Sequence, residues 1–341
     1  MRAVRFHGAR DIRLDEIEEP SCGANQVKIR PAFVGICGSD LSEYLSGPSA
    51  VPINSHPITG EKLPTTLGHE FSGTIEEVGK DVADLKVGEK VTVMPNLYDG
   101  TCVRCKLGKF HQCQSLGFIG YSALVEPLAV AWHAVSQSPI QEKVGENDMA
   151  LVIGTGPIGL AIVQVLKSKG VKTIVAADIS QKRRESADFF GATMALDPSK
   201  VDVVAQVRGL TNDGGASVAF ECSGVQPGLD SAIAGTRPGG TTVIVSKWGK
   251  KATFDAFDVL LHEKHLVGAV VYEKKDFEAV IHAIETGQIQ PRPMITSKIG
   301  MDQIVDRGFV ALLEEGDLHV KILVEIGLGN SMIPDKLRSH I

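Results

Sequence analysis

Three cysteines lie within twelve residues of the chain, at a spacing that suits a metal ion. Cys102, Cys105 and Cys113 form the pattern C-x2-C-x7-C in TCVRCKLGKFHQC. A closed tetrahedral zinc site needs one more ligand. Counting back by the first spacing gives Asp99, and His111 is the competing candidate. The alternative is a lobe with free thiols, because a carboxylate is a harder and weaker partner than a thiolate.

A second set of metal-ligand types is spread along the chain. Cys37 follows an apolar run in VGICGSD, His69 and Glu70 stand in the glycine-flanked LGHEFSG, and Glu126 interrupts the apolar ALVEPLAV. A thiolate, an imidazole and a carboxylate suit zinc, and three protein ligands leave a fourth position open for a substrate. Taken singly, each residue also has a structural explanation as a small buried side chain, a core histidine or a helix-start acid.

A glycine-rich turn predicts a nucleotide site. Gly154, Gly156 and Gly159 form G-x-G-x-x-G between an apolar strand and a helix, and Asp178 ends the next apolar strand. In that context the glycines let the backbone approach a pyrophosphate at the helix N-terminus, and the acid binds a ribose diol. The alternative is a tight turn in an unrelated α/β sheet.

The acid at the end of the second strand favours NAD over NADP. A carboxylate at Asp178 repels a 2′-phosphate, whereas a nearby arginine can accommodate one. Arg183 and Arg184 follow closely. We expect Arg183 to lie over the adenine or to pair locally.

These residues require two kinds of scaffold. Short extended runs such as QVKIRPAFVGI, FSGTIEEVG and EKVTVMP, separated by turn signals, predict an antiparallel, barrel-like unit in the first part of the chain. From about residue 150, apolar strands alternate with helices, which predicts a parallel sheet covered on both faces. The strand-like HVKILVEIGLG near the end is expected to rejoin the first unit.

Composition narrows the class of protein. The length of 341 residues suits two domains, and 43% hydrophobic with 22% charged residues is typical of a globular protein. A net charge of -6 without a basic tract argues against nucleic acid and membrane partners. Clustered cysteines behind a polar N-terminus favour a reducing, cytoplasmic setting. The final SHI loosely resembles a peroxisomal address, which is the alternative.

Together, these motifs resemble the zinc-dependent medium-chain alcohol dehydrogenases over nearly the whole chain. HPITGEKLPTTLGHEFSG, YDGTCVRCKLG, ALVEPLAVAWHAV and HVKILVEI further resemble the branch that oxidises 2,3-butanediol. The resemblance implies an α/β protein with a GroES-like, β-rich catalytic domain (residues 1–124 and 289–341) and a Rossmann NAD-binding domain (residues 125–288). It also implies a homo-oligomer, either a dimer or a tetramer.

The resemblance also assigns roles by position. Cys37, His69 and Glu126 would hold a catalytic zinc, with Glu70 as a nearby or alternative ligand, and Ser39 would begin a proton relay to solvent. A structural zinc would be held by Asp99, Cys102, Cys105 and Cys113. The cofactor would lie on Gly154, Gly156, Ile158, Gly159, Asp178 and Arg183. Zinc would act as a Lewis acid on the alcohol, whose carbon gives hydride to the nicotinamide.

The sequence departs from the family at two places. Ser42 stands where many relatives have a relay histidine, and serine does not titrate near neutral pH. In addition, GFIGYS runs directly into ALVEP near Ser122, where relatives carry a longer segment with a barrel strand. A missing strand leaves backbone groups unpaired, at about 1–3 kcal/mol for each buried group.

The resulting expectation is an NAD- and zinc-dependent dehydrogenase that interconverts (R,R)-2,3-butanediol and acetoin and reduces diacetyl. A sorbitol- or xylitol-type polyol dehydrogenase is the alternative within the class. A non-catalytic NAD-binding remnant, whose zinc geometry the deletion has destroyed, is the alternative from another class. His133 is expected to be a core residue, and Lys321 is a candidate contact of the cofactor phosphates.

Overall fold

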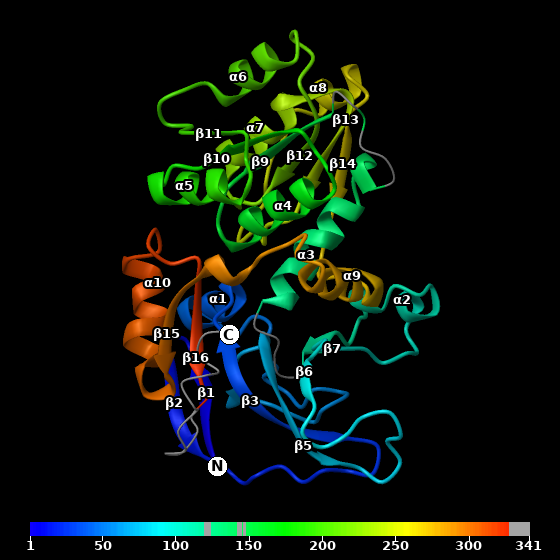
Figure 1. Ribbon diagram of the computed structural model, residues 1–341, viewed down its shortest axis with the longest axis vertical. Helices are drawn as coiled ribbons and strands as arrows, with labels where there is room; N and C mark the ends of the chain where they lie inside the picture. The colour runs from blue at the N-terminus through cyan, green and yellow to red at the C-terminus, as the bar shows by residue number, and fades with distance from the viewer. Residues whose placement is uncertain (119–123, 142–144, 146–147, 327–341) are drawn as a thin grey trace.

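The computed structural model describes residues 1–118, 124–141, 145 and 148–326, and the predicted junction near Ser122 and the C-terminal SHI lie outside these ranges. Figure 1 shows two halves, one above the other, with helices α3 (Val125–Ser136) and α9 (Lys274–Glu285) between them. Within the described ranges, no helix has the length and apolar character needed to cross a membrane.

The lower half is built from two sheets that are mainly antiparallel. One has the order β2-β1-β4 and the other the order β15-β16-β3-β5-β6. The strands are β1 (Arg2–Gly8), β2 (Asp11–Glu16), β3 (Val27–Gly35), β4 (Thr65–Thr66), β5 (Phe71–Val78), β6 (Lys90–Thr92), β15 (Ile295–Gly300) and β16 (Lys321–Glu325). β16 pairs with β3, so the end of the described chain lies beside its beginning.

Alternating burial along β5 shows that one face of its sheet is covered. Along β5, Phe71, Gly73 and Ile75 are buried while the residues between them are not, as expected for a sheet with one covered face. The main hydrophobic core of this half joins Phe6 of β1, Ile36 after β3 and Phe309 near the end of the chain.

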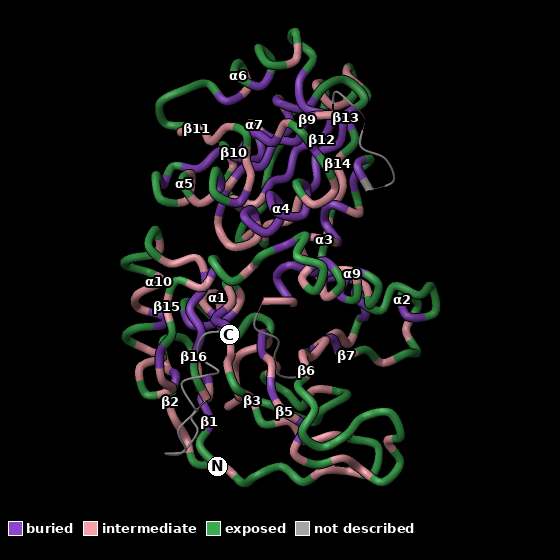
Figure 2. The backbone as a smooth tube through the Cα atoms, viewed as in Figure 1, coloured by how far each residue is buried: buried purple, intermediate pink, exposed green. Residues whose placement is uncertain are grey.

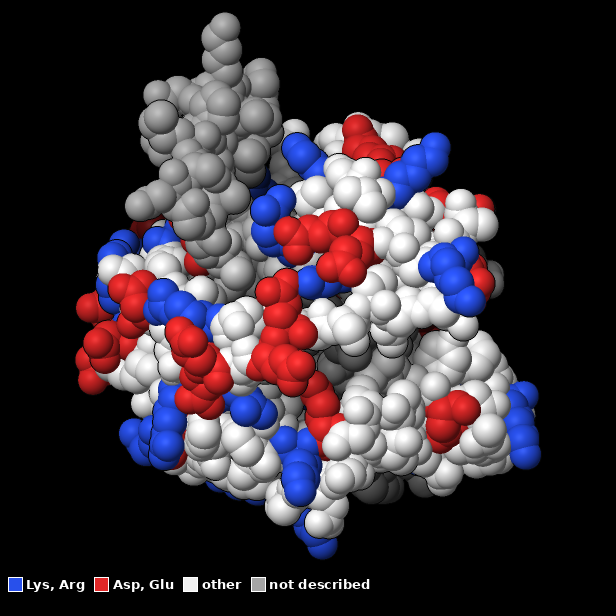
Figure 3. Space-filling view, turned by 90° about the horizontal axis from the view of Figure 1, so that it is seen from below, with Lys and Arg blue, Asp and Glu red and all other residues white. Residues whose placement is uncertain are grey.

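The described residues of the lower half enclose a pocket. A mainly apolar pocket of about 940 Å³ is bounded by β1, β3 and β5 and by residues 301–326, including Ile326 at the end of the described chain. At this end of the molecule, acidic and basic side chains are interspersed (Figure 3), as in the 3.3 Å ion pair between Arg30 and Glu76.

The upper half is a six-stranded parallel sheet of order β11-β10-β9-β12-β13-β14. Its strands are β9 (Met149–Ile153), β10 (Thr173–Ala177), β11 (Met194–Leu196), β12 (Ala216–Glu221), β13 (Thr236–Ile244) and β14 (His265–Gly268). Its helices are α4 (Pro157–Ser168), α5 (Gln181–Phe190), α6 (Val203–Leu210), α7 (Gln226–Gly235) and α8 (Ala256–Leu261). The order in which β9 lies between β10 and β12 is that of a doubly wound fold.

Burial is greatest in this parallel sheet, as Figure 2 shows in purple for β9, β10 and β12. All five residues of β9 are buried, and their side chains feed two separate clusters, with Val152 in one and Leu151 in the other. Since neighbouring side chains of a strand point to opposite faces, the sheet is covered on both sides. The predicted α/β class with a GroES-like half and a Rossmann half is therefore confirmed.

Short elements complete the chain. A projecting lobe contains β7 (Asn96–Leu97), β8 (Gly117–Phe118), α2 (Val103–Lys106) and a 3-10 turn at Phe110–Gln112. Further 3-10 turns lie at Pro139–Gln141, Arg292–Met294 and Met301–Gln303, followed by a π-helix at Ile304–Val310 and by α10 (Ala311–Glu314).

One helix was not expected from the sequence of the first half. Helix α1 (Gly38–Ser46) follows β3 directly and begins at Cys37. Asp40, the third residue of the helix, accepts a hydrogen bond from the Cys37 backbone N–H at 2.9 Å. This capping-box contact satisfies a donor that the helix itself leaves unpaired, and it fixes Cys37 at the helix start.

Candidate active site and metal centres

The structure brings Cys37, His69 and Glu70 together, although they come from different elements. One ligand atom of each lies within 4.8 Å of those of the other two. Cys37 stands at the start of α1, whereas His69 and Glu70 directly precede β5. The backbone N–H of Gly35, in β3, donates to the carbonyl of Glu70 at 2.7 Å, which ties the two segments side by side.

The His69 ring is held from both nitrogens. Its Nε2 lies 3.1 Å from Ser39 Oγ, and its Nδ1 lies 3.5 Å from Asp40 Oδ1. Burial alone would lower the pKa of His69, but the charges of Asp40 and Cys37 raise the pKa well above its ordinary value. A carboxylate behind a histidine is the usual arrangement around a metal ligand, because it fixes the tautomer and the ring orientation.

Glu70 is engaged by a buried lysine. Lys321 Nζ donates to both Glu70 oxygens, at 2.7 and 2.5 Å, and to the carbonyl of Ile36 at 3.2 Å. Both side chains are almost fully buried. Lys321, a candidate contact of the cofactor phosphates, instead has its ammonium group beside the metal-ligand residues of the lower half, where β16 places it.

Glu126 lies in the first turn of α3 and does not belong to the tight group of Cys37, His69 and Glu70. It is 5% exposed and forms no ion pair with another described residue. Burial raises its pKa to about 7, while the charge of His69 lowers the pKa and that of Glu70 raises it. Glu126 is thus close to the group and, unlike Glu70, has no lysine bound to its carboxylate.

The donor set suits zinc. A thiol, an imidazole and a carboxyl group converge in the lower half, and such a set with three protein ligands is typical of catalytic zinc sites. Since Lys321 already neutralises Glu70, Glu126 is the carboxylate whose buried charge a cation would compensate.

The cysteine lobe forms a second metal-ligand group. Ligand atoms of Asp99, Cys102, Cys105 and Cys113 all lie within 4.8 Å of one another. The Asp99 carboxylate accepts the backbone N–H groups of Thr101 and Cys102 through Oδ1, at 2.7 and 2.8 Å, while Oδ2 lies 3.2 Å from Cys113 Sγ. Those backbone donors hold the pKa of Asp99 well below its usual range.

The cysteines of the lobe differ in acidity. Backbone N–H groups, those of Gln114 and Cys105 first, lower the pKa of Cys102 to about 7, whereas burial raises that of Cys105 to about 12. Only the thiolate binds a metal, so a cation in this lobe would displace protons that the lobe otherwise retains. Four such donors fit a closed tetrahedral zinc site.

His111, the competing fourth ligand, lies elsewhere. Its ring packs edge-on against His133 at 5.0 Å between centroids, and its Nδ1 lies 3.9 Å from Glu273. His133 is buried, as expected, with Nδ1 2.7 Å from Asp276. These contacts attach the lobe to α3 and α9, and within the described ranges the geometry favours Asp99 over His111.

The glycine-rich turn has the shape of a phosphate cradle. At Gly154 the backbone has φ +86°, and a Cβ on Gly159 would lie 2.0 Å from the carbonyl oxygen of Gly154, so neither position tolerates a side chain. Around Gly156, by contrast, a Cβ would meet only open space. The Thr155 hydroxyl is buried there without a partner among the described residues. A dinucleotide pyrophosphate fits this arrangement.

The other predicted cofactor residues surround that turn. Asp178 accepts the backbone N–H of Thr155 at 2.8 Å and that of Ser180 at 2.9 Å. Ile158, in the first turn of α4, is partly buried against the core. Arg183 donates to the carbonyl of Gly316 at 3.1 Å, so it reaches across to the lower half.

A buried hydrogen-bond network at the end of β12 was not predicted from the sequence. Glu221, which is fully buried, accepts the backbone N–H groups of Ser223 and Gly224 at 2.7 and 2.8 Å and the Trp248 indole at 3.2 Å, and it also accepts the Ser246 hydroxyl. Trp248 is thereby half-buried, whereas its neighbours Lys247 and Lys250 are exposed. In the sequence, only the change from apolar residues to an acid at the end of this strand could have indicated the network.

Comparison with known proteins shows the family to which the chain belongs. The family model described as "Zinc-binding dehydrogenase" matches residues 157–286, and that described as "Alcohol dehydrogenase GroES-like domain" matches residues 23–140. The chain belongs to the zinc-binding alcohol dehydrogenases. It is an oxidoreductase that uses zinc and a nicotinamide dinucleotide.

Within this family the chain is similar to named enzymes over nearly its whole length. It is 38% identical to "(R,R)-butanediol dehydrogenase" of Neisseria gonorrhoeae, with 96% of this chain and all of that protein covered. It is also 38% identical to a solved structure, 2R,3R-butanediol dehydrogenase from Bacillus subtilis, with a TM-score of 0.87 and 96% and 99% of the two chains covered. "Sorbitol dehydrogenase" of Bacillus subtilis is 32% identical, over 72% of this chain and 74% of that protein.

The alignments also bear on the length of the chain. The one with the Neisseria protein spans 360 positions, more than the 341 residues present here. The relative therefore carries residues without a counterpart in this chain. That agrees with a shortened chain; the position of the shortening near Ser122 stays a prediction.

Proposed function

We propose that the chain is an NAD- and zinc-dependent dehydrogenase of vicinal diols. It oxidises (R,R)-2,3-butanediol to acetoin and, in reverse, reduces acetoin or diacetyl. The observation that carries this proposal is the 38% identity, over nearly the full length, to proteins named (R,R)-butanediol dehydrogenase. A relative named "Probable diacetyl reductase [(R)-acetoin forming] 2", 33% identical over 95% of this chain, supports the reverse reaction.

In this proposal Cys37, His69 and Glu126 hold the catalytic zinc. Zinc, when bound, supplies a Lewis acid that lowers the pKa of the substrate hydroxyl. Ser39, with its hydroxyl 3.1 Å from His69 Nε2, takes the substrate proton and passes it toward solvent. Ser42, at the place of the relay histidine, donates to the Gly38 carbonyl at 3.0 Å within its own helix, so water must complete the relay.

The cofactor in this proposal is NAD. Gly154, Gly156, Ile158 and Gly159 receive the pyrophosphate, and Asp178 receives the adenosine ribose. Arg184, which could have favoured a 2′-phosphate, is occupied by the carbonyls of Asp178 and Ile179, at 2.8 and 2.9 Å, and by Asp197 at 3.2 Å. A carboxylate at the strand end with its nearest arginine engaged favours an unphosphorylated ribose.

The experiment is NADH formation by the zinc-replete chain with (R,R)-2,3-butanediol, with D-glucitol and NADP in parallel arms. Diol-dependent NADH formation supports the proposal. Turnover of glucitol but not of the diol would establish the polyol alternative, which the relative named sorbitol dehydrogenase favours. A chain that binds NADH, turns over neither substrate and holds no zinc at Cys37 would be the non-catalytic remnant.

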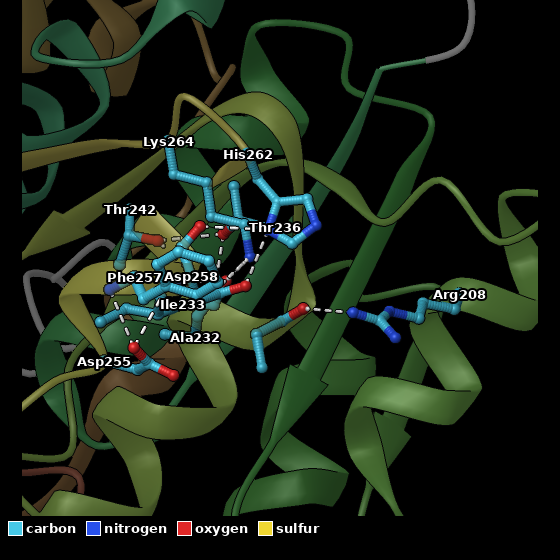
Figure 4. Close-up of polar contacts among 11 residues, drawn as sticks. Arg208, Ala232, Ile233, Thr236, Thr242, Asp255, Phe257, Asp258, His262 and Lys264 are labelled. Atoms are coloured by element: carbon cyan, nitrogen blue, oxygen red, sulfur yellow. Dashed lines mark hydrogen bonds and ion pairs between the residues drawn. The ribbon is translucent and has the colours of Figure 1, made fainter. Parts of the chain in front are cut away.

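We also propose a homo-oligomer, formed through the edge of the parallel sheet. Helix α8 is fastened to that edge by polar contacts (Figure 4): Asp255 caps the helix, and Lys264 donates to Asp258 at 3.0 Å and to the Ile233 carbonyl at 2.8 Å. The apolar side chains of this fixed helix are nevertheless exposed, with Phe257 at 67%, Leu260 at 71% and Leu261 at 60%.

Such a patch beside the edge strand β14 is typical of a protein interface. Light scattering of the wild-type chain and of Leu260→Lys tests this interface. Dissociation of an oligomer by the substitution supports the interface, and a monomeric wild type rules it out.

The proposal also includes the domain boundaries at residues 124/125 and 288/289 and a cytoplasmic location. Limited proteolysis and cell fractionation test them.

A further inference from the structure

The buried hydrogen-bond network around Glu221 has no role in the function described so far. Glu221 is the last residue of β12 and is fully buried. Its Oε1 accepts the backbone N–H groups of Ser223 and Gly224, at 2.7 and 2.8 Å, and the Ser223 hydroxyl at 2.7 Å. Its Oε2 accepts the Trp248 indole N–H at 3.2 Å and the Ser246 hydroxyl. One oxygen therefore holds the loop after β12, and the other holds the segment after β13.

A carboxylate suits this position because the groups bound to it are all donors. An ionised carboxylate only accepts hydrogen bonds, and bonds to a charged acceptor are stronger than those between neutral groups. The backbone of Glu221 adds to the same connection, since its carbonyl accepts the N–H groups of Val245 and Ser246 at 3.0 and 3.2 Å. Glu221 thus fixes the two segments relative to each other through both its side chain and its backbone.

The loop after β12 lies directly against the glycine-rich turn. The backbone N–H of Cys222 donates to the Ile153 carbonyl at 2.8 Å. A Cβ added to Gly154 would lie 2.9 Å from the backbone nitrogen of Ser223, and one added to Gly228 would lie 2.0 Å from the Ser223 hydroxyl oxygen. Because these approaches are so close, a shift of the loop after β12 would change the shape of the cofactor site.

The order of the strands indicates which half of a dinucleotide meets these segments. β9 lies between β10 and β12. In the proposed function the pyrophosphate lies at the turn after β9, and the adenosine ribose lies at Asp178, which follows β10. A dinucleotide crosses the carboxyl ends of the strands at this point of a doubly wound fold, so its other nucleotide extends over the ends of β12 and β13. The segment after β13 also borders the lower half, where Lys247 Nζ lies 3.5 Å from Ser49 Oγ.

We propose that Glu221 is a positioning residue for the nicotinamide half of the cofactor: its carboxylate holds residues 222–224 and 245–248 in the arrangement that receives this half. This inference rests on the proposed function, in which the glycine-rich turn and Asp178 bind the rest of the cofactor. Glu221 is fully buried and acts through the loops that it holds. Since these loops are ordered in advance, cofactor binding does not have to order them.

The test is Glu221→Gln, which keeps the shape of the side chain but replaces one acceptor oxygen with a donor group. Calorimetric titration measures the affinities for NADH and for AMP, which has the adenosine but no nicotinamide. We expect NADH affinity to fall by about tenfold or more, because binding must then order the loops, whereas AMP affinity should stay as in the wild type. Unchanged NADH affinity, or a parallel loss of both affinities, would overturn the inference.

A milder substitution decides the question if Glu221→Gln does not fold. Ser246→Ala removes one hydroxyl donor from the carboxylate and leaves its other partners in place. This variant should also lose NADH affinity while it keeps AMP affinity, with a smaller loss than in Glu221→Gln. Unchanged NADH affinity in a folded Ser246→Ala protein would overturn the inference.

Asp148→Asn is the matched control. Asp148 also accepts a backbone N–H and a hydroxyl, those of Gly145 at 2.6 Å and Ser217 at 2.8 Å, but it directly precedes β9 and so lies at the opposite end of the sheet. Its substitution should change neither affinity. If the wild type itself binds neither NADH nor AMP, the proposed cofactor site fails. If the wild type binds both and Glu221→Gln binds both equally well, only the role of Glu221 fails.

Discussion

Lys321 Nζ contacts both carboxylate oxygens of Glu70, at 2.7 and 2.5 Å, although the two residues are 251 positions apart in the chain. Lys321 is the first residue of β16, the last described strand, and Glu70 is the residue before β5. Because the same ammonium group also reaches the carbonyl of Ile36, the pair supports the backbone that leads into Cys37.

Lys321→Met should destabilise the protein by about 3–5 kcal/mol, since it leaves the buried Glu70 carboxylate without its partner. Urea denaturation of the zinc-bound protein measures this. Adding Glu70→Gln should restore part of the loss, because it removes the uncompensated charge. Lys264→Met is the control: Asp258, its partner, is 29% exposed, so water can replace the lysine. Equal losses in the two methionine variants would contradict the argument.

Asp99→Ala should abolish zinc binding in the cysteine lobe, and Asp99→Cys should retain it, because a thiolate suits zinc at least as well as a carboxylate. Elemental analysis is expected to give two zinc ions per chain for the wild type and for Asp99→Cys, and one for Asp99→Ala. His111→Gln, which faces His133 and not the sulfur atoms, should leave two. Loss of one zinc in His111→Gln would instead identify the histidine as the fourth ligand.

The features that could be predicted from the sequence are those that local spacing encodes. The pattern of Asp99 with three cysteines, and the glycine turn followed by an acid, each lie within a few elements, and the structure assembles both. The alternation of apolar strands with helices from about residue 150 could be predicted for the same reason, because hydrophobic periodicity is local.

The features that were missed depend on contacts between distant segments. No spacing rule pairs Lys321 with Glu70, and none brings the Trp248 indole to Glu221. The family resemblance suggested Glu126 as a ligand, but only its burial and the occupation of Glu70 by a lysine give a physical reason for choosing between the two carboxylates.

Glu273→Gln should weaken the attachment of the cysteine lobe in a pH-dependent manner. Glu273 lies 2.6 Å from Lys275 and 3.1 Å from Lys109 of the lobe, and these contacts, Lys275 first, lower its pKa to about 2. A lowered pKa in the folded state stabilises the protein above the unfolded pKa of 4.5 and loses that contribution as the pH falls toward 2.

The difference in unfolding free energy between the wild type and Glu273→Gln should therefore be about 1 kcal/mol or less at pH 7. It should shrink below pH 4.5, and high salt should reduce it at neutral pH. Glu278→Gln is the control, since its pair with Lys274 spans 3.5 Å between two exposed side chains. A difference in unfolding free energy that grows as the pH falls would contradict a lowered pKa of Glu273 in the folded protein.

Gly156→Ala should separate cofactor binding from folding. A Cβ at Gly156 meets nothing within 4 Å, so the substituted protein should fold with an unchanged melting temperature. The methyl group would, however, occupy the space in which the pyrophosphate approaches the backbone, and we expect NADH affinity to fall at least tenfold in a fluorescence titration. Gly209→Ala, in the last turn of α6 where a Cβ also meets nothing within 4 Å, should bind NADH normally and be slightly more stable. Gly159→Ala, whose Cβ would collide with the Gly154 carbonyl, should lose stability as well as NADH binding. Full NADH affinity in Gly156→Ala would show that the cofactor pyrophosphate does not bind at this turn.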